Sequence, residues 1–138
     1  MEIKPYLFFD GQCEAAFNFY AKCLGGNITF SMKYGDSPGC ETLTPEARDR
    51  IMHATLTIGD KLLMASDCPV GRYEKPQGFS ISLDYDTTEE AERVFGELSE
   101  EGQIHMPMGA TFWAIRFGMV TDRFGTPWMV GCNKGQPE

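Results

Sequence analysis

The chain has 138 residues, enough for one compact domain or for two half-sized modules that share a core. Hydrophobic residues make up 42% and aromatic residues 12%, which is typical of a folded protein and not of a disordered one. The formal net charge of −8 comes from 20 acidic and 12 basic residues, and no local basic cluster offsets it. This charge argues against binding to nucleic acid or to anionic lipid.

The apolar runs and the cysteines also limit the class of protein. Every apolar run is shorter than a membrane span, and the N-terminal stretch lacks the long apolar region of a signal peptide. The five cysteines are odd in number and contain no CxxC pair, which suits free thiols in a reducing compartment. The sequence therefore predicts a soluble cytoplasmic protein with no membrane and no nucleic-acid partner.

The first half of the chain predicts one helix among four strands. In chain order the elements are a strand at 5–9, a helix at 11–26, a strand at 27–35, a loop at 36–50 and a hairpin at 53–67. The helix stops at Gly25 and Gly26. The loop is expected to hold one helical turn, because Thr44 can cap it and Pro45 suits its first position. The hairpin turns at Gly59-Asp60.

After a linker at 68–78 the same order of elements returns. In chain order these are a strand at 79–86, a helix at 87–102 and strands at 103–108, 112–121 and 126–132. A capping box of Thr87 and Glu90 opens the helix, and Gly102 is expected to close it. The last two strands are joined across the loop 122–125.

Identical residues recur 76 positions apart and support a duplication. The identical pairs are Leu7/Leu83, Asp10/Asp86, Glu14/Glu90, Ala15/Ala91, Phe19/Phe95, Gly26/Gly102, Ile28/Ile104 and Met32/Met108. Many helix-strand units would share some of these residues, so the pattern is suggestive of a repeat. Each module has one helix for one sheet face, and the other face must be buried between modules or against a partner.

Four stretches, in this order and spacing, resemble the PhnB-like (YjdN-like) branch of the glyoxalase/bleomycin resistance/dioxygenase superfamily, also called vicinal oxygen chelate. They are "PYLFFDG", "FNFYAKCLGG", "IMHATLTIGDKLLMASD" and "FGMVTDRFGTPWMV". The resemblance implies an α+β fold of two βαβββ modules, at about 1–68 and 77–134, forming a single glyoxalase-like domain over 1–138. It also implies curved mixed sheets with helices packed outside, and a bacterial homodimer that holds a small-molecule ligand.

Metal-dependent members of that superfamily hold a divalent ion with side chains from the first and last strand of each module. Alignment to the family places Pro5, Met64, Ser80 and Met129 at these four positions. Proline has no donor atom, and thioethers suit copper(I) rather than nickel, zinc, manganese or iron(II). A catalytic ion normally needs three protein ligands. The resemblance and these residues therefore predict no metal and no other cofactor. A methyl-donor site is not indicated either, since no glycine-rich strand-to-helix turn precedes an acidic ribose ligand.

The first hairpin determines the interpretation of His53. A two-residue turn determines which residues of the two strands lie opposite each other. One face of the hairpin is then mixed in polarity and should line the cavity, and the other face is apolar and should pack on a helix. The pairs on the mixed face are His53/Ser66, Thr55/Met64 and Thr57/Leu62. His53 is then a structural histidine hydrogen-bonded beside Ser66, a ligand contact, or a metal ligand without partners.

The loop 122–125 predicts that the second hairpin pairs Gly118 with Met129 and Arg116 with Gly131. Arg116 would then share the cavity face with Met129 and could anchor a carboxylate or phosphonate. The alternative is a salt bridge to an acid such as Asp84. Trp113 and Trp128 are expected in the helix-facing core. The predicted apolar lining of the cavity consists of Leu7, Phe9, Met64, Met129 and Phe112.

Three functions remain open at this point. The preferred one is a metal-independent small-molecule-binding protein of the glyoxalase/bleomycin-resistance type, with the ligand unknown. Its predicted ligand-binding residues are His53, Thr55, Met64, Ser66, Ser80, Arg116, Met129 and Phe9. The alternative is a lyase or isomerase acting on a small organic acid or phosphonate, for which only His53 and Glu41 offer donors. A structural or regulatory dimer with a vestigial pocket is the third. No catalytic residue is predicted.

Overall fold

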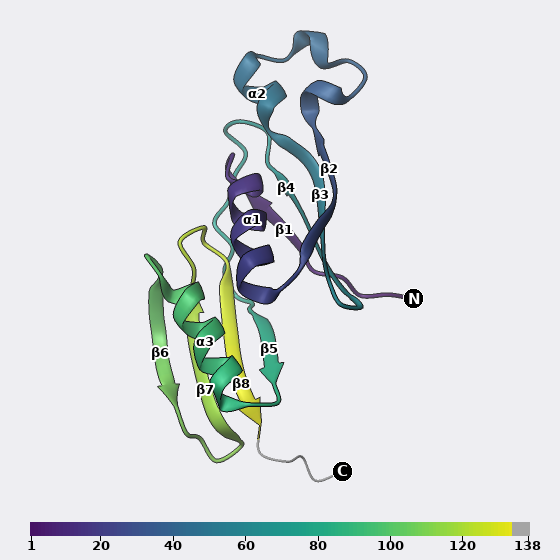
Figure 1. Ribbon diagram of the computed structural model, residues 1–138. Helices are drawn as coiled ribbons and strands as arrows, with labels where there is room; N and C mark the ends of the chain where they lie inside the picture. The colour runs from purple at the N-terminus through teal and green to yellow at the C-terminus, as the bar shows by residue number, and fades with distance from the viewer. Residues whose placement is uncertain (134–138) are drawn as a thin grey trace. The chain divides into compact units, whose positions relative to one another are not determined.

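The structure is a computed structural model that describes residues 1–133. The chain divides into two compact units, the first from Met1 to Glu74 and the second from Lys75 onward. Each unit repeats the order strand, helix, strand, strand, strand around one four-stranded mixed sheet (Figure 1). This confirms the predicted α+β fold of two βαβββ modules. Assignment of both modules to a single domain stays a prediction.

The first unit has the strand order β1-β4-β3-β2, with β1 parallel to β4 and the other pairs antiparallel. Its elements are β1 (Tyr6–Phe9), α1 (Cys13–Leu24), β2 (Asn27–Lys33), η1 (Tyr34–Asp36), η2 (Cys40–Thr42), α2 (Pro45–Asp49), β3 (Ile51–Ile58) and β4 (Lys61–Asp67). Helix α2 begins as predicted, because the Thr44 side chain accepts a hydrogen bond from the Ala47 amide at 3.1 Å. Helix α1 ends at Leu24 and is followed by Gly25 as its C-cap, whose φ of 74° is left-handed.

The register of the first hairpin is the predicted one. Thr55 lies opposite Met64 and Thr57 lies opposite Leu62, across a turn in which Gly59 has a φ of 60°. The alternate residues form the face that packs under α1, where Leu56 is fully buried. The two-residue turn fixed this register, and with it the residues that face away from the helix.

The second unit has the strand order β5-β8-β7-β6, again with one parallel pair, β5 with β8. Its elements are β5 (Ile81–Tyr85), α3 (Thr88–Ser99), β6 (Gln103–Gly109), β7 (Ala114–Thr121) and β8 (Pro127–Asn133). The Thr87 side chain caps α3 by accepting from the Glu90 amide at 3.2 Å. The helix ends at Ser99, and the left-handed residue after it is Glu101 (φ 58°), not the expected Gly102.

The predicted register of the second hairpin is wrong by one residue. Gly118 lies opposite Val130, and Met129 lies opposite Met119. The cause is Asp122, whose carboxylate Oδ1 accepts from the Thr126 amide at 3.1 Å and whose own amide donates to the Thr126 carbonyl at 3.0 Å. Thr126 is thereby drawn into the loop, and the strand pairing shifts.

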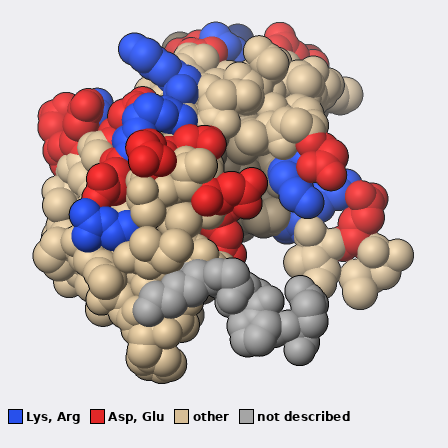
Figure 2. All heavy atoms as spheres, turned by 60° about the horizontal axis from the view of Figure 1, so that its bottom comes forward, with Lys and Arg blue, Asp and Glu red and all other residues tan. Residues whose placement is uncertain are grey.

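All strand pairings recorded within residues 1–133 join strands of the same unit, and the segment 68–80 that connects the units has no strand of its own. None of the helices in this part of the chain is long and apolar enough to span a membrane. On the face shown in Figure 2, basic side chains lie beside acidic ones and do not gather into one basic patch.

Candidate ligand-binding face

The first sheet has one face covered by α1 and one face turned away from it, here called the open face. The strand registers place Phe30, Thr55, Met64 and Tyr6 in one row across β2, β3, β4 and β1 of this face. The open face is defined by eight residues. They are Tyr6, Phe8, Phe30, Met32, His53, Thr55, Met64 and Ser66.

His53 lies at the centre of the open face, and both of its ring nitrogens have partners. Tyr6 Oη is 3.0 Å from His53 Nδ1, and Thr55 Oγ1 is 3.3 Å from His53 Nε2. The histidine is therefore hydrogen-bonded, as one interpretation of the sequence held, but to Tyr6 and Thr55. These contacts hold the imidazole in place, and the two residues at its ends are accessible, Tyr6 at 37% exposure and Thr55 in part.

Aromatic rings surround this polar group. The Tyr6 ring lies 5.1 Å from the Phe8 ring and 5.6 Å from the His53 ring, and the Phe30 ring lies 5.8 Å from His53. Phe8 and Phe30 are 52% and 51% exposed, unusually high for phenylalanine in a sheet. Exposed aromatic side chains around a fixed polar group are typical of ligand or partner surfaces.

Four of the predicted binding residues meet on the open face, and three of its aromatic residues were not predicted. His53, Thr55, Met64 and Ser66 are the four that the hairpin register gave. The residues that sequence reasoning missed are Tyr6, Phe8 and Phe30. Strand β1 reads "YLFF", so alternation of polar and apolar residues could not show which side chains face the helix.

The expected facing of Phe9 is wrong, and so is that of Leu7. Phe9 is 1% exposed and lies on the helix side, with ring centroids 6.5 Å from Phe17 and 6.4 Å from Tyr20 of α1. Leu7 is 4% exposed and alternates with Tyr6 and Phe8 along β1. Because β1 is flanked by α1 on this side, Leu7 and Phe9 belong to the core.

The expected facing of Arg116 is also wrong. With the shifted register Arg116 lies on the side of the second sheet that faces α3, where it forms an ion pair with Glu92 of that helix. It therefore does not share a face with Met129. The salt-bridge alternative is correct in kind, although the partner is Glu92 rather than Asp84.

The second sheet also has a face turned away from its helix. Met129 lies on it in register with Met119 and Ser82, while Ser80 precedes β5. Trp128 is fully buried on the helix side as expected, and its indole N–H donates to Asp122 Oδ2 at 2.8 Å. Trp113 was expected in the core, but it is 43% exposed.

The exposure of Trp113 follows from a tight turn. The amide of Ala114 donates to Thr111 Oγ1 at 2.9 Å, and the amide of Thr111 donates to the Ala114 carbonyl at 3.1 Å. Phe112 and Trp113 are the two residues between these ends, so they are held outside the core. Their rings are in contact, and the Trp113 ring packs edge-on against Phe117 at 5.5 Å.

In the superfamily that the sequence resembles, metal-dependent members hold a divalent ion at four strand positions. Tyr6, not Pro5, lies beside Met64, and Ser82, not Ser80, lies beside Met129. Each sheet therefore offers one thioether and one hydroxyl group at these positions, which are poor donors for a hard or borderline divalent ion. Among residues 1–133, no three His, Cys, Asp or Glu side chains form a group that could hold a metal. The residues present do not fit such an ion.

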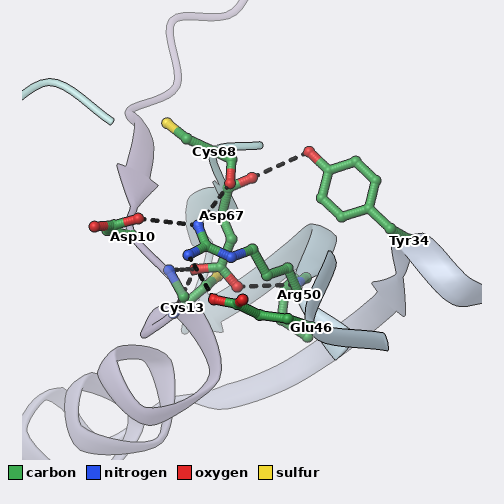
Figure 3. A network of polar contacts seen from close by, with 9 residues as sticks. Asp10, Cys13, Tyr34, Glu46, Arg50, Asp67 and Cys68 are labelled. Carbon is green, nitrogen blue, oxygen red and sulfur yellow. Dashed lines mark hydrogen bonds and ion pairs between the residues drawn. The ribbon is translucent and has the colours of Figure 1, made fainter. Parts of the chain in front are cut away.

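A second polar group, centred on Asp67, lies at the start of α1 (Figure 3). Asp67 is 2% exposed, and its carboxylate accepts three backbone hydrogen bonds of 2.9 Å, from the amides of Gly11, Cys13 and Ile51. Its carbonyl accepts a further hydrogen bond from the Tyr34 hydroxyl at 3.1 Å. The satisfied carboxylate ties β3, β4 and the β1–α1 turn together, which indicates a structural role.

Arg50 reinforces the same corner from the other side. Its guanidinium donates to Asp10 Oδ1 at 3.0 Å and to the Cys68 carbonyl at 2.8 Å, and Glu46 Oε1 lies 3.9 Å away (Figure 3). Gly11 beside it has a φ of 89°, a left-handed conformation that favours glycine, and a Cβ there would only be in ordinary van der Waals contact with the guanidinium at 3.4 Å. The side chain is 11% exposed and joins α2, the β1–α1 turn and the start of the 68–80 segment.

Cys13 lies beside the Asp67 carboxylate and is fully buried. Burial, and secondarily the negative charge of Asp67, raises the pKa of its thiol to about 12. A thiol with so high a pKa does not supply a thiolate near neutral pH, so Cys13 is not a nucleophile. The residues around Asp67 therefore have a structural and not a catalytic role, and the open face remains the candidate site.

Comparison with known proteins gives matches over nearly the whole chain. Residues 2–130 match the family model of the Glyoxalase/Bleomycin resistance protein/Dioxygenase superfamily. The chain is 34% identical over 145 residues to Protein YjdN of Escherichia coli K12, covering 99% of each protein. The crystal structure of protein PA1353 from Pseudomonas aeruginosa is 48% identical with a TM-score of 0.88, covering 96% of this chain and 98% of that one. The PhnB protein from Bacillus cereus is 28% identical with a TM-score of 0.80, covering 96% and 99%.

Proposed function

Because the chain belongs to the glyoxalase/bleomycin resistance protein/dioxygenase superfamily and is similar to YjdN and PhnB proteins, we propose that it is a metal-independent small-molecule-binding protein. The open face of the first sheet is the proposed binding surface. The observation that carries this proposal is the hydrogen-bonded histidine, His53, among exposed aromatic rings. The donor set at the superfamily's metal positions supports metal independence, since it lacks imidazole and carboxylate groups.

We also infer that the protein acts as a homodimer. The open face of the first sheet exposes Phe8 and Phe30, and the turn before β7 in the second unit exposes Phe112. Exposed apolar area of this kind favours association, and closed symmetric dimers are the commonest form it takes. Static light scattering at micromolar concentration should give twice the chain mass of 15.4 kDa. A monomer at that concentration would count against this inference alone, because the binding proposal does not require a second chain.

Binding is tested by native mass spectrometry of protein purified without dialysis, paired with a thermal-shift screen of small organic compounds. A bound mass, or compounds that raise the melting temperature, is expected for the natural sequence and for Phe79→Ala, and not for Phe30→Ala. The two phenylalanines are similarly exposed, at 49% and 51%, but only Phe30 lies on the open face. Binding that survives in both variants would move the site away from this face, and no binding in any form would contradict the function.

Metal independence has its own measurement. Protein purified without chelator should carry less than about 0.1 equivalent of any divalent transition metal by elemental analysis. Close to one equivalent per chain, retained through a desalting column, would overturn the proposal. The lyase or isomerase alternative would then be the better account.

A further inference from the structure

We propose that Tyr6, His53 and Thr55 form one hydrogen-bonded triad that binds the polar substituent of an uncharged, planar aromatic compound. The inference rests on the proposed small-molecule function and adds the class of ligand and the atoms that hold it. The triad is the series Tyr6 Oη, His53 Nδ1, His53 Nε2 and Thr55 Oγ1, with steps of 3.0 Å and 3.3 Å at its two ends.

The direction of the two hydrogen bonds is coupled through the imidazole. A neutral histidine has one nitrogen that donates and one that accepts. If Tyr6 donates to Nδ1, then Nε2 donates to Thr55, whose own hydrogen is left free. If Thr55 donates to Nε2, then Nδ1 donates to Tyr6, whose hydrogen is left free. In either state one end of the triad offers a donor and the other end offers only lone pairs, so a ligand can select the state that suits it.

The surroundings of the triad favour an uncharged ligand. None of the eight residues of the open face is an acid, a lysine or an arginine. Lys33, which follows Met32 on β2, is engaged by Asp49 at 3.0 Å. An anion on this face would lose hydration without gaining a charge partner, whereas a neutral amide or hydroxyl group would exchange water for the triad.

The rings around the triad favour a flat ligand. Neighbouring rings among Tyr6, Phe8, His53 and Phe30 are tilted, with centroids 5.1 to 5.8 Å apart. Phe8 lies on β1 beside Tyr6, and Phe30 lies on β2, next to the strand that carries His53 and Thr55. Aromatic pairs gain from such tilted or offset contacts beyond the area they bury. Met32 and Met64 add polarizable thioethers that adapt to a ring edge.

Three small compounds separate the effect of the ligand's charge on binding from the effect of its shape. Benzamide is neutral and flat, benzoate differs from it chiefly in charge, and cyclohexanecarboxamide differs in lacking the flat ring. Binding is followed by the nitrogen-15 and proton signals of labelled histidine at pH 8. The protein has two histidines, and His105, whose Nε2 lies 2.7 Å from Thr121 Oγ1 in the second unit, serves as the internal control.

Benzamide should shift the His53 ring nitrogens in opposite directions, as a change of tautomer requires, and leave His105 unchanged. Benzoate and cyclohexanecarboxamide should each bind at least about ten-fold more weakly, the scale of one lost hydrogen bond or ring contact. Tyr6→Phe should weaken benzamide binding about five-fold and alter the His53 nitrogens without ligand. The matched control Tyr34→Phe removes a hydroxyl that bonds the Asp67 carbonyl, and it should change neither.

The outcomes of these experiments distinguish this inference from the proposed small-molecule-binding function on which it rests. If benzoate binds as tightly as benzamide, or Tyr6→Phe binds benzamide unchanged, the triad and the ligand class are wrong while binding at the open face stands. If no probe shifts His53 and the mass-spectrometry and thermal-shift tests also find no ligand, both the inference and the proposed function fail.

Discussion

Gly26 and Gly102 occupy equivalent points in the two units, each directly beneath a strand of its own sheet. A Cβ added to Gly26 would lie 2.6 Å from the Thr57 carbonyl oxygen, and a Cβ added to Gly102 would lie 2.6 Å from the Thr121 carbonyl oxygen. Real Cβ atoms do not approach a backbone oxygen so closely, so in both units the helix can return to the sheet only through a glycine. The pair is one of those that recur 76 positions apart in the sequence.

Alanine at either position should therefore lower the stability of the protein. We expect Gly26→Ala and Gly102→Ala each to cost about 2–3 kcal/mol in free energy of unfolding, because the strand backbone has to move. Gly96 provides the matched control, since it lies within α3 with open space around its Cβ position. Gly96→Ala should instead stabilise by about 0.5–1 kcal/mol. Urea unfolding of the three variants gives these changes in the free energy of unfolding. Equal changes in all three would contradict the explanation from close approach to the strand backbone.

Glu101 is held in a conformation that its side chain disfavours. It is the one non-glycine residue among positions 1–133 with a positive φ, at 58°. Its ion pair with Arg123 at 3.3 Å is exposed and so contributes little. Glu101→Gly should raise the free energy of unfolding by about 0.5–1 kcal/mol, whereas Glu101→Ala, which keeps a Cβ, should not. A gain from both substitutions would assign the effect to charge and not to the backbone.

The Asp67 carboxylate should be sensitive to the loss of a single oxygen. In the natural protein, backbone N–H groups donate to both carboxylate oxygens of Asp67. An asparagine keeps the size of the side chain but replaces one of these oxygens with an amide NH2 group, which cannot accept a hydrogen bond. We expect Asp67→Asn to cost about 3 kcal/mol, the scale of buried donors left without partners. Asp60→Asn in the exposed hairpin turn makes the same chemical change and should stay within about 0.5 kcal/mol. Similar midpoints in chemical denaturation would show that the carboxylate is dispensable.

The buried thiol of Cys13 makes stability depend on alkaline pH. Its pKa in the folded protein is raised from 9.0 to about 12, so its contribution is fully present below pH 9 and is lost between pH 9 and pH 12. The stability of the natural protein should fall relative to Cys13→Ala by about 1 kcal/mol between pH 9 and pH 10. Unfolding curves at pH 8, 9 and 10 give this difference, and parallel losses in the two proteins would mean that Cys13 ionises alike folded and unfolded.

The residues of the open face could be predicted from the sequence only in part, for a physical reason. The two-residue turn at Gly59-Asp60 sets which residues of β3 and β4 face away from α1, so His53, Thr55 and Met64 could be placed. No such signal exists for β1, where four consecutive apolar residues suit either face. Tyr6, which supplies the hydroxyl group nearest to His53, was therefore invisible until the parallel pairing with β4 was known.

In the second unit a single side chain, that of Asp122, accounts for the error in the predicted register of the hairpin. A loop of four residues was assumed for 122–125, but Asp122 binds the amides of Phe124 and Thr126 with its carboxylate and so extends the loop by a residue. Register slips of one residue exchange the two faces of a strand, which is why Arg116 was assigned to the wrong side. Trp128 was placed correctly because β8 kept its own alternation.

Within residues 1–133, each strand pairs only with strands of its own unit, so a cut in the chain between the two sheets should leave both sheets intact. Arg72 is exposed near the end of the first unit, in a turn held by the hydrogen bond from its amide to the Pro69 carbonyl at 3.0 Å. A tryptic cut there breaks no sheet hydrogen bond and yields two fragments, each with a complete four-stranded sheet and its helix. Two half-length polypeptides, expressed separately, should therefore each be able to form their own four-stranded sheet.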